Sequence, residues 1–144
     1  LQADFSGWHE SITALLASVN SESCFKWALF DRDPLPRWCT GRVSLLGDAC
    51  HPTLPFMAQG AAMAIEDAAV LAACLGDRSD IAASLMRYQN LRMARTKRIQ
   101  RVSRRNAYVF HMSGMVSAVR NVLAGCMLPD TMDWLYGYDA LRSN

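Results

Sequence analysis

The sequence predicts a protein of the α/β or α+β class that is mostly helical after residue 58. Residues 42–46 form a short apolar run that Gly47 ends, and large apolar residues alternate along residues 25–30. Long stretches with helical periodicity follow Gly60. With 144 residues, 51% of them hydrophobic, the chain has enough apolar material for the core of one domain.

The first 41 residues predict a helix, a strand and a surface connection. Residues 10–19 place Ile12, Leu15 and Leu16 on one side of a helix, and residues 25–30 alternate as a strand does. Two prolines with flanking charges follow. We expect residues 31–41 to be the crossing between two domains, or between parts of two domains.

A strand, a turn and a helix start form the centre of the chain. Asp48 stands at the carboxyl end of the strand over residues 42–46, which is where α/β folds bind ligands. The helix that begins at Gly60 has little side-chain bulk over residues 60–62, so its free N–H groups are exposed. An acidic acceptor beside a bare helix N-terminus suits a polyhydroxyl, partly anionic cofactor.

Helices fill the rest of the chain. We expect one over residues 60–75, stopped at Gly76-Asp77, and a longer one over 81–112 with a break near Asn106. Ser113-Gly114 precedes a short helix over 115–126, and residues 128–130 form a turn. The expected buried stripes are Ile65, Ala68, Ala69, Ala72 and Leu75 in the first helix, and Ile81, Leu85, Tyr88, Leu91, Ile99, Val102 and Val109 in the second.

Charge is distributed unevenly although the net charge is only +2. Residues 81–129 contain nine basic side chains and no acidic one. A nucleic-acid surface is an alternative, but the stretch lacks interleaved exposed aromatics and a known reading motif. A solvated face, with some arginines paired to acids elsewhere in the fold, explains the pattern better.

Composition gives little support to metal, secretory or membrane classes. The five cysteines have no CxxC spacing and only three scattered histidines accompany them, so we expect no metal site and free thiols in a reducing cytoplasm. No secretory signal is apparent. The apolar stretch 107–128 is interrupted by His111 and Arg120, which argues against a membrane span.

Several motifs together resemble those of one known family. Gly47-Asp48-Ala49-Cys50-His51-Pro52, continued without a gap by residues 55–68, resembles the second flavin motif of the class A FAD-dependent aromatic hydroxylases. Residues 134–139 resemble the tail of the salicylate hydroxylase and 6-hydroxynicotinate 3-monooxygenase branch. Further matches are residues 5–8, residues 27–32 and the L-x-x-Y-x-x-x-R pattern of Leu85, Tyr88 and Arg92.

The resemblance implies FAD as cofactor, NAD(P)H as co-substrate and O2-dependent hydroxylation of a phenolic or hydroxypyridine substrate. It implies that Asp48 accepts hydrogen bonds from the ribityl group. Gln59, Gly60, Ala61 and Ala62 would pass beneath the pyrimidine edge of the flavin ring, where the helix dipole stabilises negative charge on the reduced flavin. Ordinary close helix packing is the alternative for the three small residues.

The same resemblance assigns the loop before that helix to the substrate side. Pro52 and Pro55 would fix the loop, and Pro55, Phe56 and Met57 would line the substrate pocket, with simple buried packing as the alternative for Phe56 and Met57. Ala58 replaces a glycine found in many relatives, which predicts a stiffer loop. We interpret His51 as structural rather than catalytic.

Two further motifs of the family, the amino-terminal G-x-G-x-x-G and a more central D-G pair, are absent from this sequence. We therefore expect the carboxy-terminal part of a two-domain FAD/NAD(P)-binding hydroxylase fold, with any catalytic residue upstream of residue 1. Residues 1–40 would end the substrate domain, 41–112 would return to the FAD-binding domain, and 113–144 would form a helical tail.

The partners implied are a small aromatic substrate, without nucleic acid or membrane, and a homodimer is left open. The alternative functions are an inactive fragment or interaction module, and, less favoured, a nucleic-acid binder that uses its basic helix.

Overall fold

The computed structural model describes residues 2–76, 80–127 and 132–142. Its helices are α1 (Glu10–Ala17), α2 (Gly60–Leu75), α3 (Ile81–Phe110), α4 (Gly114–Met127) and α5 (Asp133–Tyr136), and its strands are β1 (Cys39–Thr40) and β2 (Val43–Ser44). Short 3-10 turns lie at Ala3–Phe5, Ser21–Ser23, Gly47–Ala49 and Pro55–Met57. None of the described helices is both long and apolar enough to cross a lipid bilayer.

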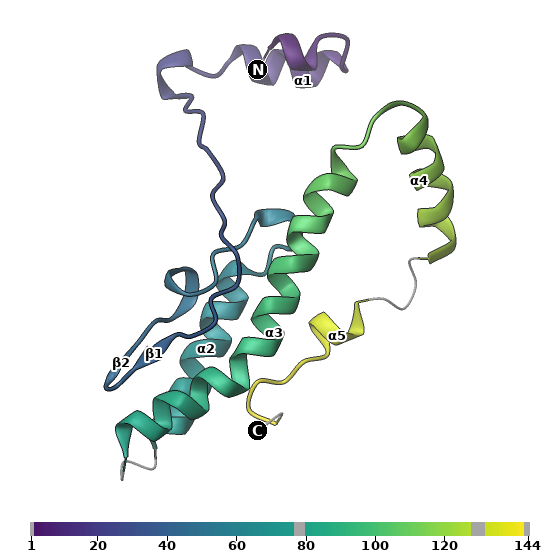
Figure 1. Ribbon diagram of the computed structural model, residues 1–144. Coiled ribbons are helices and arrows are strands. Elements are labelled where there is room, and N and C mark those ends of the chain that lie inside the picture. The colour runs from purple at the N-terminus through teal and green to yellow at the C-terminus, as the bar shows by residue number, and fades with distance from the viewer. Residues whose placement is uncertain (1, 77–79, 128–131, 143–144) are drawn as a thin grey trace.

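The antiparallel pair of α2 and α3 forms the centre of the structure, and the β1–β2 hairpin lies against it (Figure 1). An extended segment leads from the hairpin back to α1, which stands apart from the pair, and α5 returns beside α3. Two apolar clusters hold the pair together. The first comprises Trp38, Cys39, Cys50, Val70, Cys74, Leu85 and Tyr88, and the second Met57, Met63, Ile99 and Leu135.

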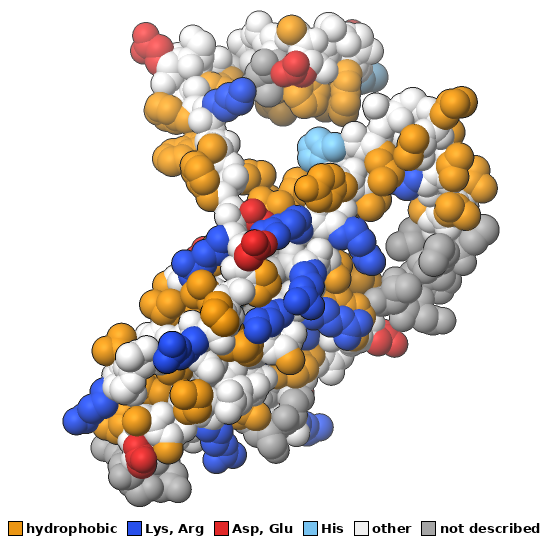
Figure 2. Space-filling model, viewed as in Figure 1, with side chains coloured by type: hydrophobic (Ala, Val, Ile, Leu, Met, Phe, Trp, Pro, Cys, Tyr) orange, Lys and Arg blue, Asp and Glu red, His pale blue; other side chains and the backbone are white. Residues whose placement is uncertain are grey.

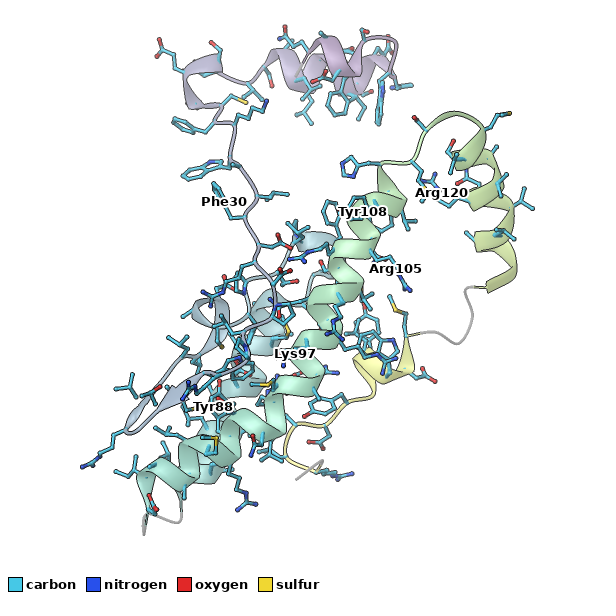
Figure 3. The ribbon with its side chains drawn as sticks, in the orientation of Figure 1. Phe30, Tyr88, Lys97, Arg105, Tyr108 and Arg120 are labelled. Atoms are coloured by element: carbon cyan, nitrogen blue, oxygen red, sulfur yellow. The ribbon has the colours of Figure 1, made fainter. Side chains whose placement is uncertain are left out.

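Polar contacts attach the hairpin to α3. The N–H groups of Trp38 and Cys39 both donate to Gln89 Oε1, at 2.6 and 3.1 Å. The Tyr88 hydroxyl donates to the Leu45 carbonyl at 3.4 Å, and its ring packs on Trp38 with centroids 5.8 Å apart (Figure 3). These bonds satisfy backbone groups that a two-residue strand cannot pair by itself.

The helix predictions are largely confirmed. The helix over residues 60–75 is observed with the expected bounds, whereas α3 ends at Phe110 and not at 112, and α4 spans Gly114–Met127 and not 115–126. The first helix ends at Ala17, two residues early. The predicted break near Asn106 is wrong, because α3 continues without interruption to Phe110. The Asn106 side-chain amide donates to the Phe56 carbonyl of the loop and so does not compete for the backbone hydrogen bonds of its own helix. Asp77 and the turn over residues 128–130 lie outside the described residues.

The two strand predictions are corrected. Residues 25–30 are extended but unpaired, and Trp27 is 83% exposed. The buried strand over 42–46 is reduced to Val43–Ser44 in a hairpin, with Val43 69% exposed. A strand needs a partner for its backbone, and among the described residues only β1 provides one.

The predicted buried face of α2 is wrong at three of its five residues. Ile65 is 71% exposed, and Ala68 and Ala72 are exposed as well, whereas Ala69 and Leu75 are half-buried and Leu75 packs against the first cluster. The buried stripe instead follows Met63, Asp67, Val70 and Cys74. The buried face of α2 differs from the predicted one because Asp67 is buried in an ion pair with Arg92. Hydropathy alone does not reveal such a pair. On α3, the predicted burial of Leu85, Tyr88 and Ile99 is confirmed.

Candidate functional site

Asp48 lies in the turn that follows the hairpin, and α2 packs directly against that turn. Gly47 takes a φ of +61°, and a Cβ on it would stand 3.3 Å from the Ala64 Cβ, so both the backbone angle and the close approach require glycine. The Asp48 side chain is exposed, and no residue in the described ranges bonds to its carboxylate. It is therefore an acceptor open to a ligand.

The start of α2 is the second part of the site. Gln59 precedes the helix and makes no side-chain cap, and the first helical bond runs from the Met63 N–H to the Gln59 carbonyl at 2.8 Å. The N–H groups of residues 60–62 come before that bond, at the positive end of the helix dipole. A Cβ on Gly60 would meet only Thr53 Cγ2, at an ordinary 3.7 Å, so packing within the protein does not require glycine there. Close approach of a ligand would explain it.

The loop before α2 contains the predicted substrate-pocket residues. Pro55 is exposed, Phe56 half-buried and Met57 buried. The Phe56 ring packs edge-on against Phe110, with centroids 5.8 Å apart. Ala58 ends the loop with a φ of 51°, the left-handed conformation that explains why a glycine would suit this position.

A buried charge cluster lies beneath these parts. Asp67 is inaccessible to solvent, accepts from Arg92 Nε at 2.7 Å on one carboxylate oxygen, and accepts from His51 Nε2 at 2.6 Å on the other. The Gly47 N–H also donates to Asp67, at 3.2 Å. Arg92 further donates to Glu66 at 2.6 Å. Asp67 thus fixes both ends of the 47–51 segment to α2.

The cluster keeps its acids ionised. Burial by itself would raise the pKa of Asp67, but hydrogen bonds from His51 and Arg92 outweigh it and hold the pKa below the usual value. The pKa of Glu66 is lowered in the same way, against burial, by Arg95 and Arg92. Burial and the nearby Asp67 charge raise the pKa of Cys50 to about 12 and also raise the pKa of Tyr88.

Cys50, His51 and Asp67 have potential metal-ligand atoms within 4.8 Å of one another. Their environment disfavours a cation, because Arg92 already pairs with Asp67 and the raised pKa keeps the Cys50 thiol protonated. The His51 Nδ1 is buried without a hydrogen-bond partner among the described residues. Cys24, Cys39, Cys50 and Cys74 are free thiols, as expected.

The basic side chains gather over α3 in Figure 2, and several of them pair with acids as predicted. Arg92 and Arg95 bind Glu66, and Arg104 binds Asp31 at 2.8 Å and Asp33 at 2.6 Å. Arg32 of the same extended segment donates to the Ala49 carbonyl. The predicted pairing of arginines with acids from elsewhere in the fold is therefore confirmed.

Arginines of α3 also hold the carboxy-terminal segment. Arg95 donates to the carbonyls of Trp134 and Leu135, both at 3.1 Å, and its guanidinium lies 3.8 Å from the Tyr138 ring centroid. Arg98 lies at the same distance from the Trp134 ring. These contacts pack α5 against α3 on the side of Glu66.

The roles predicted for Asp48 and residues 59–62 stay predictions, and the sequence did not reveal the buried cluster. Asp67 is not part of the buried stripe predicted for its helix, and Arg92 enters the sequence analysis only through the L-x-x-Y-x-x-x-R pattern. The signal was present: nine basic residues without an acid on one stretch require acids from a neighbour, and Glu66-Asp67 lies on the helix that precedes it. Also missed were Gln100 and Ser103, polar residues that interrupt the apolar stripe of α3.

Comparison with known proteins decides the family. Residues 6–105 match the family described as "FAD binding domain". The chain belongs to this FAD-binding domain family. It is 48% identical over 122 residues to 3-hydroxybenzoate 6-hydroxylase 1 of Aquipseudomonas alcaligenes, a match that covers 81% of this chain and 31% of that protein. It is 42% identical over 141 residues to 6-hydroxynicotinate 3-monooxygenase of Bordetella bronchiseptica, a match that covers 96% of this chain and 32% of that protein.

Solved structures of similar proteins share the fold. Klebsiella pneumoniae HpxO, complexed with FAD and uric acid, matches with a TM-score of 0.76 and 32% identity over 94% of this chain and 35% of its own. A salicylate hydroxylase substrate complex matches with a TM-score of 0.67 and 33% identity over 93% and 33%. The resemblance to FAD-dependent aromatic hydroxylases is therefore confirmed, and the chain spans about a third of the length of the curated relatives it matches.

Proposed function

We propose that this chain supplies the ribityl and ring side of the FAD site in a monooxygenase that hydroxylates an aromatic substrate. The observation that carries the proposal is the unpaired, exposed carboxylate of Asp48 beside the uncapped start of α2, in a chain of the FAD-binding domain family. An acceptor for hydroxyl groups next to donors for partly anionic atoms fits FAD, which carries both.

Each part of the site has a separate role in this proposal. Asp48 accepts hydrogen bonds from the ribityl hydroxyls. The backbone of Gln59 and residues 60–62 lies under the pyrimidine edge of the ring, where the helix dipole favours negative charge. FAD supplies the oxidation chemistry, with NAD(P)H as electron donor and O2 as co-substrate. The residues of this chain bind, orient and exclude water.

The substrate side is formed by Pro55, Phe56 and Met57. An apolar wall with an aromatic ring suits a planar aromatic ring. The relatives are named for 3-hydroxybenzoate, 6-hydroxynicotinate and, among solved structures, salicylate. We therefore propose a phenolic or hydroxypyridine acid as substrate, with the group that activates it outside residues 1–144.

The organisation of the parent protein follows from the same proposal. Residues 1–40 end a substrate domain, residues 41–112 belong to the FAD-binding domain, and residues 113–144 form a tail. The enzyme works in the cytoplasm, where free thiols such as those of Cys39 and Cys50 persist.

The test uses the parent protein, meaning the polypeptide that carries residues 1–144. Purified parent protein is expected to contain FAD and to oxidise NADH or NADPH faster when 3-hydroxybenzoate, 6-hydroxynicotinate or salicylate is added, with a hydroxylated product. Flavin-free protein that binds no added FAD would contradict the proposal and favour the interaction-module alternative. FAD without turnover of any aromatic acid would contradict the substrate class alone.

A further inference from the structure

Three polar side chains on one face of α3 hold the loop that leads into α2. Gln100 Nε2 donates to the Pro52 carbonyl at 3.0 Å, and Ser103 Oγ donates to the Leu54 carbonyl at 2.5 Å. Asn106 Nδ2 donates to the Phe56 carbonyl at 3.3 Å. The donors are three residues apart on the helix and the acceptors two residues apart on the loop. We call Gln100, Ser103 and Asn106 the α3 ladder.

The ladder compensates for backbone groups that the loop cannot satisfy itself. The loop pairs with no strand among the described residues, and Pro52 and Pro55 offer no N–H. Gln100 is 5% exposed and Ser103 is fully buried. Burying polar side chains costs free energy unless each finds a partner, and apolar residues would fill the same face without that cost. Polar residues here fix one alignment of the loop against α3.

That alignment places the proposed substrate wall. Asn106 Nδ2 also contacts Met57 Sδ at 3.0 Å, so Asn106 holds both Phe56 and Met57. The Phe56 ring packs against His111, which follows the same helix, with centroids 5.7 Å apart. The other anchor, Asp67, acts upstream at Gly47 and His51. The main anchor of the turn that carries Asp48 is therefore Asp67, and the main anchors of the loop that carries Phe56 are Ser103 and Asn106, although Gln100 also donates to the Arg32 carbonyl at 3.5 Å.

We propose that Gln100, Ser103 and Asn106 are positioning residues that align Phe56 and Met57 with the aromatic substrate. This inference rests on the proposed function. The ladder acts through the loop carbonyls and touches no reacting group. Asp67 fixes the turn that carries Asp48. Removing one of the three α3 side chains should therefore weaken substrate binding more than FAD binding.

Ser103→Ala tests the inference in the parent protein, with Thr96→Val as matched control. Both changes remove a buried hydroxyl from α3, but among the described residues the Thr96 hydroxyl bonds only to the Arg92 and Met93 carbonyls of its own helix. Ser103→Ala is expected to keep its FAD content and to weaken substrate binding about fivefold or more, measured from the substrate-induced change in flavin absorbance. Hydrogen exchange should accelerate in residues 53–58 and not in the centres of α2 and α3.

The outcomes separate the two proposals. Unchanged substrate affinity and unchanged loop exchange in Ser103→Ala would overturn the ladder, as would equal effects from Thr96→Val. Ser103→Thr keeps the hydroxyl and should restore both measurements. If Ser103→Ala fails to fold, Asn106→Leu removes the half-buried side-chain amide with little change in volume and should give the same result. Wild-type protein without FAD contradicts the proposed function, whereas loop exchange still tests the ladder.

Discussion

Arg92 Nε lies 2.7 Å from Asp67 Oδ1, and neither side chain is accessible to solvent. This bond joins α3 to α2 across 25 residues of sequence. On its other side Asp67 holds the Gly47 N–H and His51. The packing of the helix pair and the position of the turn that carries Asp48 therefore depend on the same carboxylate.

Breaking this pair should be strongly destabilising. Asp67→Leu or Arg92→Met alone leaves a buried charge with an incomplete set of partners, at an expected cost of about 3–5 kcal/mol in the free energy of unfolding. The double variant replaces both charges by apolar groups and should recover only part of the loss, because His51, the Gly47 N–H and Glu66 each still lose a partner. Urea denaturation of the four proteins measures the coupling. Additive effects would show that the two residues do not act as a pair.

Acid should unfold the protein through the same cluster. The pKa values of Asp67 and Glu66 are lowered in the folded state, so the unfolded state takes up protons first as the pH falls. Their contribution to stability is fully present above the ordinary carboxyl pKa of about 4 and is lost as the pH falls below it. Denaturation midpoints between pH 7 and 3 measure the loss. Midpoints that stay constant down to pH 3 would contradict it.

Replacing Ala58 by glycine should increase the stability of the fold. Its φ of 51° is unfavourable for alanine, and the exposed side chain gives no packing in return. Ala58→Gly is expected to stabilise the fold by about 0.5–1 kcal/mol after allowing for the greater freedom of glycine in the unfolded state. Ala68→Gly, at an exposed position in the middle of α2, should cost about 1 kcal/mol. Thermal unfolding distinguishes the two, and the same sign for both would refute the reasoning.

Arg95 should contribute far more to stability than Arg101, which lies on the same helix. Arg95→Ala loses two hydrogen bonds to Glu66, two to α5 carbonyls and the stacking over Tyr138, so we expect a loss of about 2 kcal/mol. Arg101 is exposed, and its replacement by alanine should change stability by less than about 0.5 kcal/mol. Urea denaturation of both variants is the measurement, and limited proteolysis at residues 132–142 reports release of the segment. Equal losses would contradict the stabilising role assigned to the Arg95 contacts.

Local signals in the sequence predicted much of the helical structure. Gly60 and Gly76 mark helix ends that depend on nearby residues alone, and those boundaries are correct, whereas α4 begins one residue earlier than predicted. The strand prediction for residues 25–30 failed because alternation shows only that a segment suits a sheet. It does not show that a partner strand lies beside it.

Long-range partners account for what the sequence could not predict. The face of α2 was assigned from hydropathy, which excludes Asp67 from the interior, and its burial depends on Arg92 in another helix. The Ser103 hydroxyl likewise has its partner 49 residues away. In contrast, the start of α2 at Gly60 was predicted, because a helix start is a local feature.

The affinity of the parent protein for FAD, with and without the Asp48 carboxylate, tests the central claim most directly. Asp48→Ala should weaken FAD binding about tenfold or more in a fluorescence titration, since hydrogen bonds to a charged acceptor are lost. Glu22→Ala, which removes an exposed carboxylate in the amino-terminal segment that stands apart from the helix pair in Figure 1, should bind FAD as wild type does. Unchanged FAD affinity and content in Asp48→Ala would contradict the claim that this carboxylate holds the ribityl group.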